Sequence, residues 1–171
     1  YPIKFVPILK DKIWGGQKLK TVLNKQSDLH NIGESWEISD VDGDTSIVSN
    51  GYYKGKSLKD LLKILGPDLV GQQNYRIFED KFPLLIKFID AREDLSIQLH
   101  PNDKLAAERH NSFGKTEMWY VMQADEGSSL ISGFNRELDK ETYIKYFESG
   151  KLEEVLNREQ IEDDDVFFLP A

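Results

Sequence analysis

The sequence predicts a mainly β protein, a β-sandwich or barrel with short α-helical insertions. Short apolar or alternating runs, separated by turn residues, recur along the 171 residues, and helical periodicity is confined to a few connecting segments. The balance of 39% hydrophobic and 30% charged residues is typical of a globular domain. We therefore expect a single domain over residues 1–171.

Short strands make up most of the expected structure. Alternation around Pro2 and Pro7 predicts an edge strand or extended arm at the N-terminus. The turn at 42–44, Asp-Gly-Asp, predicts a hairpin between strands at 34–40 and 45–50. Further strands are expected at 82–90, 94–100, 117–123, 128–134 and 163–171.

Helical patterns interrupt the strands in two larger regions. Ser57 and Asp60 form a capping-box pattern ahead of leucines on one stripe, which predicts a helical insertion near 57–80. A second helical insertion is expected near 139–159, where apolar residues recur at helical spacing. Between the two regions, Asn102 is placed to cap a short helix.

The composition excludes several kinds of site. The chain has no cysteine, which removes disulfides and thiolate metal ligands together and fits a reducing cytoplasm, where we expect the protein to lie. A formal net charge of −8 without a basic stripe disfavours nucleic-acid binding. Membrane association is not expected, because no apolar run approaches the roughly 20 residues that span a bilayer. A signal peptide is not expected either, because the N-terminus lacks a basic start, a long apolar stretch and a small-residue cleavage site. Any metal must be held by histidine, carboxylate or amide oxygen.

The sharpest chemical signal lies between residues 87 and 120. If the run 94–100 is a strand, Gln98 and His100 are two residues apart and leave the same face. Glu117 begins the next apolar run and can join them from a neighbouring strand. An amide oxygen, an imidazole and a carboxylate together suit a borderline divalent cation such as zinc.

These residues also have a structural interpretation. Gln-x-His spacing is common by chance, so a capped or buried structural histidine explains His100 equally well. Glu117 favours the metal site, because a carboxylate that heads an apolar run must face solvent or meet a partner. His30 and His110 lie in polar, loop-like or helix-end segments, and we expect both to be solvated surface residues.

Two lysines accompany the predicted metal site. Lys87 interrupts an otherwise apolar run, where a buried ammonium needs an anionic partner, a substrate group or a lowered pKa. The alternative is a lysine whose stem covers apolar surface while its head stays in water. Lys115 lies two residues before Glu117 and shares its side of an extended chain. The two form either a surface pair or, beside a metal, a site that binds an anion and moves protons.

The motifs that carry these features resemble those of one known family along essentially the whole chain. The family is type I mannose-6-phosphate isomerase in its short bacterial form, a zinc-dependent member of the cupin superfamily. The resemblance implies a cupin-type jelly-roll β-sandwich. It is carried by the runs FPLLIKFIDAREDLSIQLHPND and GKTEMWYVM, and by WGG, GESWEIS, GKSLKDLL and VFFLPA.

The resemblance implies roles for individual residues. One zinc ion per chain would be bound, and sugar phosphate would be the partner molecule. The family pattern places a further histidine ligand beyond Ala171 and an arginine later still, so we expect a fragment with little or no activity. The implied metal ligands are Gln98, His100 and Glu117; the implied substrate-binding residues are Lys87, Glu34 and Lys115, with Lys115 and Lys87 also the catalytic candidates.

The implied reaction is the reversible conversion of mannose 6-phosphate into fructose 6-phosphate, an aldose-ketose isomerisation of carbohydrate metabolism. The alternative is a non-catalytic cupin that binds a sugar or sugar phosphate. The presence of both lysines and three ligand residues favours the enzyme, because a binding module needs no acid-base pair. A metal-dependent cupin of different chemistry, such as a dioxygenase, is disfavoured because those proteins more often use several histidines. The sequence makes no prediction of oligomeric state.

Overall fold

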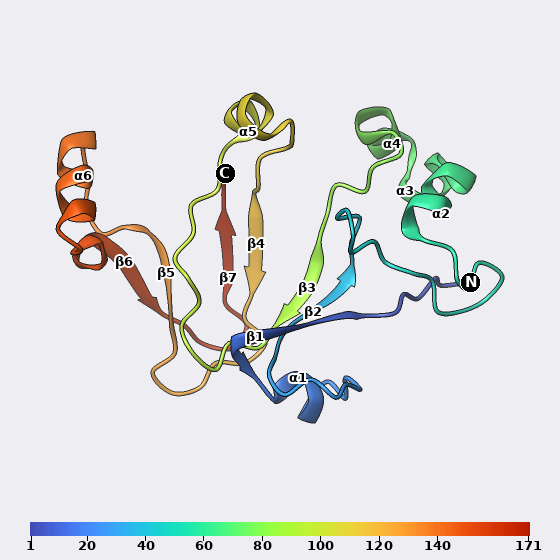
Figure 1. Cartoon of the computed structure of the whole chain (residues 1–171), viewed down its shortest axis with the longest axis horizontal. Coiled ribbons are helices and arrows are strands. Elements are labelled where there is room, and N and C mark those ends of the chain that lie inside the picture. The colour runs from blue at the N-terminus through green and yellow to red at the C-terminus, as the bar shows by residue number, and fades with distance from the viewer. The chain divides into compact units, whose positions relative to one another are not determined.

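The computed structural model of the chain describes residues 1–171. It consists of short antiparallel strands whose connections contain short helices (Figure 1). The chain divides into two units, Tyr1–Leu95 and Ser96–Ala171. The predicted mainly β fold with helical insertions is confirmed. None of the helices combines the length and the apolar character that crossing a membrane requires.

The first unit is built on a three-stranded antiparallel sheet. Its strands are β1 (Ile8–Gly16), β2 (Ile32–Ile38) and β3 (Ile86–Ile89), and β2 lies between the other two. The register places Trp36 opposite Lys87 on β3. Because alternate residues of a strand share a face, β2 determines which polar side chains meet on each side of this sheet.

Close backbone contact explains the glycines of this sheet. A Cβ atom on Gly15 of β1 would lie 2.5 Å from the backbone nitrogen of Gly33 on β2, so the two strands approach more closely than side chains allow. A Cβ on Gly16 would likewise meet the Asp90 carboxylate, which instead accepts a hydrogen bond from the Lys18 N–H at 2.6 Å. The Trp-Gly-Gly run therefore lies inside β1 and serves packing.

The predicted helix after Ser57 is confirmed as α2 (Leu58–Leu65) with its capping box. Ser57 Oγ accepts from the Asp60 N–H at 3.1 Å, and Asp60 Oδ2 accepts from the Ser57 N–H at 3.0 Å. The helix buries Leu58, Leu61 and Leu62 in the core of the unit. Figure 1 shows α2, α3 and α4 gathered together. The other helices of the unit are α1 (Lys18–Thr21), α3 (Pro67–Val70) and α4 (Gln72–Phe78).

The second unit contains two antiparallel strand pairs. One pair joins β4 (Glu117–Tyr120) to β7 (Val166–Leu169), with Glu117 opposite Leu169. The other joins β5 (Ser129–Phe134) to β6 (Leu156–Gln160). The helices are α5 (Asp103–His110), with the predicted Asn102 cap, α6 (Lys140–Glu148) and the 3₁₀ helix η1 (Leu152–Val155).

Three predicted elements differ from the structure. The expected strand at 94–100 is wrong: this run pairs with no strand and leaves Ile97 and Leu99 exposed, so it has no sheet face on which to bury them. The expected strand at 45–50 is reduced to isolated bridges. The end of the helical region 139–159 is the strand β6, because pairing with β5 outweighs its helical spacing.

The α2 cap gives a direct stability prediction. Ser57→Ala removes the side-chain acceptor for the Asp60 N–H, so we expect the free energy of unfolding to fall by about 1 kcal/mol. Urea denaturation measures it. Ser112→Ala, an exposed serine that follows α5, is the control and should change stability by less than about 0.5 kcal/mol. Equal effects of the two substitutions would contradict the role of the cap.

Candidate functional site

Three of the predicted site residues lie together in the unit Ser96–Ala171. His100 Nε2 is 3.3 Å from Glu117 Oε2. Lys115 Nζ is 3.1 Å from His100 Nε2 and 3.4 Å from Glu117 Oε1. The side chains of His100 and Glu117 are 24% and 18% exposed, so the imidazole and the carboxylate are partly shielded from water. We call these three residues the His100 cluster.

Local backbone packing brings the cluster together. The Asn102 side chain accepts from the Leu105 N–H at 3.0 Å and starts α5 directly after Pro101. Gly114 then returns against this turn, where its N–H donates to Asp103 Oδ1 at 2.8 Å. A Cβ on Gly114 would lie 2.6 Å from the Asp103 nitrogen, so only glycine fits here. The next residue is Lys115, whose N–H donates to the Pro101 carbonyl at 3.3 Å.

Gln98 makes a different contact. Its amide nitrogen donates to Ser96 Oγ at 3.0 Å, and the side chain is exposed. No hydrogen bond joins Gln98 to His100 or Glu117. The segment pairs with no neighbouring strand, so Gln98 and His100 do not lie on a sheet. The expectation that a common sheet face would direct both side chains to one side therefore has no basis here.

His100 and Glu117 fit two ligand positions of a zinc ion. Two ligands about 2.1 Å from a tetrahedral zinc lie about 3.4 Å apart, and His100 Nε2 and Glu117 Oε2 lie 3.3 Å apart. No group of three or more histidine, cysteine, aspartate or glutamate side chains is arranged to hold a metal ion. The Lys115 ammonium contacts the same two side chains and is a donor only, so it adds charge and no ligand atom.

The other two predicted residues meet in the unit Tyr1–Leu95. Lys87 Nζ lies 2.9 Å from Glu34 Oε1, and the Trp36 indole N–H donates to Glu34 Oε2 at 2.8 Å. Glu34 is only 7% exposed. Each oxygen of this buried carboxylate therefore has its own donor, which satisfies the requirement for burying a charge.

These contacts change the pKa of Glu34. Burial raises the pKa, but the hydrogen bonds from Lys87 and Trp36, together with the charges of Lys87 and Lys12, lower it further than burial raises it. The pKa of Glu34 therefore lies below its ordinary value of 4.5, and the carboxylate is charged at neutral pH. The partly buried ammonium of Lys87 thus has an anionic partner, one of the possibilities that the sequence left open.

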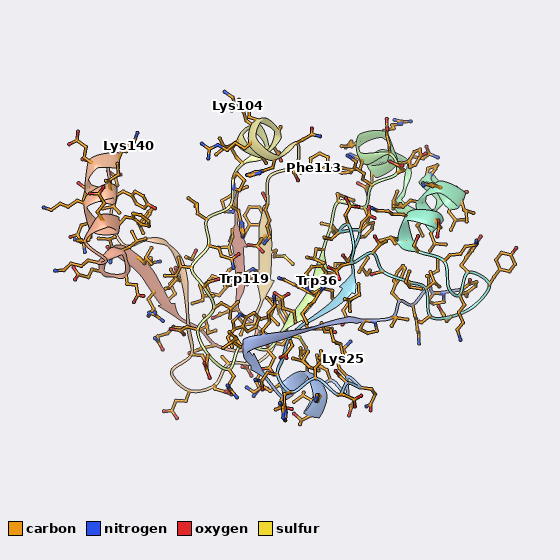
Figure 2. All side chains as sticks on the ribbon, viewed as in Figure 1. Lys25, Trp36, Lys104, Phe113, Trp119 and Lys140 are labelled. Carbon is orange, nitrogen blue, oxygen red and sulfur yellow. The ribbon has the colours of Figure 1, made fainter.

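Sequence reasoning missed Trp36 as a partner of Glu34. The signal was present, because Trp36 follows Glu34 by two residues on the predicted strand and so shares its face. Figure 2 labels Trp36 on this sheet. Lys10 of β1, also not singled out from sequence, places its ammonium 4.8 Å from the centre of the Trp36 ring.

Comparison with known families and proteins gives a consistent match. Residues 3–130 match the model of the family described as phosphomannose isomerase type I, catalytic domain. The chain is 35% identical to mannose-6-phosphate isomerase ManA of Bacillus subtilis (strain 168), over 99% of this chain and 52% of that protein. It is 36% identical to mannose-6-phosphate isomerase of Streptococcus mutans, over 94% of this chain and 49% of that protein.

A solved structure agrees with these matches. The crystal structure of the mannose 6-phosphate isomerase from Bacillus subtilis superposes with a TM-score of 0.86 at 34% identity, over 99% of this chain and 52% of that chain. The fold is thus of the cupin type that the sequence motifs implied. The chain spans about half the length of the relatives it matches.

The lowered pKa of Glu34 predicts a pH-dependent contribution to stability. A carboxylate whose pKa is lower in the folded chain stabilises the fold fully above its ordinary pKa of 4.5, and this stabilisation is lost as the pH falls through the lower folded-state pKa. Glu34→Gln has no such charge. We expect the difference in unfolding free energy between wild type and Glu34→Gln to shrink as the pH falls below 4.5.

Urea denaturation at a series of pH values measures this difference. Glu126→Gln, the same substitution at an exposed turn position, is the matched control. A Glu34→Gln difference that stays constant down to acid pH would contradict the lowered pKa.

Proposed function

Because the chain belongs to the phosphomannose isomerase type I family, we propose that it forms part of a zinc-dependent mannose-6-phosphate isomerase of the cytoplasm. The observation that carries this proposal is the His100 cluster, in which an imidazole, a carboxylate and an ammonium meet within 3.4 Å. The names of the relatives supply mannose 6-phosphate as the substrate. Fructose 6-phosphate is the ketose that the proposed aldose-ketose isomerisation forms from it.

In this proposal, one zinc ion is held by His100 and Glu117, joined by the amide oxygen of Gln98. The 3.3 Å separation of the His100 and Glu117 donor atoms supports the first two assignments. For Gln98 to bind the zinc ion, its side-chain amide must rotate away from its contact with Ser96. The proposal includes a further histidine ligand beyond Ala171; since β7 pairs antiparallel with β4, a ligand that follows β7 would emerge near Glu117.

The substrate assignments rest on charge and hydrogen-bonding capacity. A sugar phosphate is an anion, and in a protein of net charge −8 its binding needs local positive charge. Lys87 and Lys115 supply that charge. Glu34 adds a charged acceptor beside Lys87, so this pair can donate to one sugar hydroxyl and accept from it.

The reaction transfers a proton between C1 and C2 of the sugar. When bound, a zinc ion supplies Lewis acidity that stabilises negative charge on the sugar oxygens. We assign the proton transfer to Lys115 Nζ, which contacts His100 and Glu117: as the amine it takes the proton from one carbon, and as the ammonium it returns the proton to the other. Lys87 orients the substrate. The assignment of Lys115 separates an isomerase from a non-catalytic sugar-phosphate binder, which needs no proton carrier.

The metal assignment is tested with two histidines of the same unit. His100→Ala removes a ligand, and because even the loss of an outer-shell partner costs about 10- to 100-fold in affinity, we expect zinc binding to weaken by about 100-fold or more. His110→Ala, at the exposed end of α5, should leave the affinity unchanged. Competition with a chromophoric chelator gives the dissociation constants. Unchanged affinity in His100→Ala would overturn the assignment.

The catalytic assignment is tested by Lys115→Met in a chain extended to the full length of the relatives. Loss of the proton carrier should lower kcat by about 100-fold or more, with bound zinc retained. A coupled assay of fructose 6-phosphate formation measures kcat. Lys104→Met, an exposed lysine of α5, is the control with the same change in net charge. Normal turnover in Lys115→Met would exclude Lys115 as the proton carrier.

A further inference from the structure

We infer that Trp36 is a positioning residue for the Glu34–Lys87 pair: its indole N–H holds the Glu34 carboxylate in the orientation that pairs with Lys87 and faces a sugar hydroxyl. This inference rests on the proposed function, which assigns Glu34 and Lys87 to the substrate. Trp36 itself is not required to touch the substrate.

The two donors act on different oxygens of one carboxylate. Lys87 Nζ lies 2.9 Å from Oε1 and Trp36 Nε1 lies 2.8 Å from Oε2. A single contact to an ammonium lets a carboxylate rotate about it, since an ammonium is a compact charge that binds from many directions. The second, directional N–H on the other oxygen removes that freedom and sets the plane of the Glu34 carboxylate.

Trp36 itself makes a second contact, with Lys10 of β1. The Lys10 ammonium lies 4.8 Å from the centre of the indole ring, within the range of a cation–π contact. Lys10 also forms an ion pair with Asp44 in the turn after β2. These contacts leave the indole little freedom to rotate away from Glu34.

This arrangement matters for recognition of a sugar hydroxyl. A hydroxyl both donates and accepts, so a charged carboxylate beside an ammonium offers both partners at once. Such recognition requires that Glu34 stays charged and keeps its orientation. The charges around it come from Lys87 on β3 and from Lys12 and Lys10 on β1, with Asp44 balancing Lys10. Trp36 contributes a neutral donor that lowers the pKa of Glu34 without adding charge.

The first test uses the wild-type chain and needs no substitution. In a ¹⁵N-labelled sample titrated with acid, the indole N–H resonance of Trp36 should shift with the same midpoint as the side-chain carboxyl of Glu34. The indole of Trp119, in the other unit, is the internal control and should not follow that midpoint. A Trp36 resonance that is insensitive to the ionisation of Glu34 would overturn the inference.

The second test is Trp36→Phe, which keeps an aromatic ring for Lys10 and removes the N–H. The pKa of Glu34, read from its carboxyl ¹³C shift, should rise from the wild-type value, whereas Trp119→Phe should leave it unchanged. An unchanged pKa in Trp36→Phe would contradict the inference. If Trp36→Phe does not fold, the acid titration of the wild-type Trp36 indole resonance alone tests the inference.

Binding of mannose 6-phosphate separates the inference from the proposed function. Losing a hydrogen bond to a charged group should weaken binding in Trp36→Phe by about tenfold, and Glu34→Gln should weaken it at least as much. If Glu34→Gln binds weakly and Trp36→Phe binds like wild type, the positioning role of Trp36 is overturned and the substrate assignment of Glu34 stands. Wild-type binding in both Glu34→Gln and Lys87→Met overturns the substrate assignment. In that case the positioning role of Trp36 is still tested by the pKa of Glu34 in Trp36→Phe.

Discussion

The shielding of two carboxylates from water on short strands is the constraint on which both groups of candidate residues depend. A buried carboxylate without a partner is costly, so each one determines which side chains must gather around it. Glu34 gathers Lys87 and Trp36 on the three-stranded sheet. Glu117 gathers His100 and Lys115 at the start of β4. The candidate functional residues are thus the ones that pair with a buried carboxylate, Glu34, and a partly buried one, Glu117.

Much of this organisation could be predicted from the sequence, because it is encoded locally. The capping box at Ser57 and the leucine stripe after it specify α2 within a few residues. Asn102 specifies the start of α5 in the same way. The contact of Lys115 with Glu117 could also be predicted, because the two residues share one side of an extended segment that leads into β4.

The remaining features depend on pairing between segments that are distant in the sequence, and the periodicity of one segment does not reveal its partner. The run 94–100 has the alternation of a strand but no partner strand, and the Gln98 side chain hydrogen-bonds to Ser96. The end of the region 139–159 becomes β6 because β5 lies beside it. The contact of Lys10 with Trp36 required the register of β1 on β2, which no local pattern specifies.

The role of His100 as a ligand of the metal is the central assignment. The chain has three histidines, His30, His100 and His110, so ¹⁵N resonances of the imidazole nitrogens can be assigned and followed as zinc is added. Coordination predicts that the Nε2 resonance of His100 shifts strongly with one equivalent of zinc, while those of His30 and His110 stay in place. A His100 resonance that does not move, or a shift at His30 or His110 instead, would contradict it.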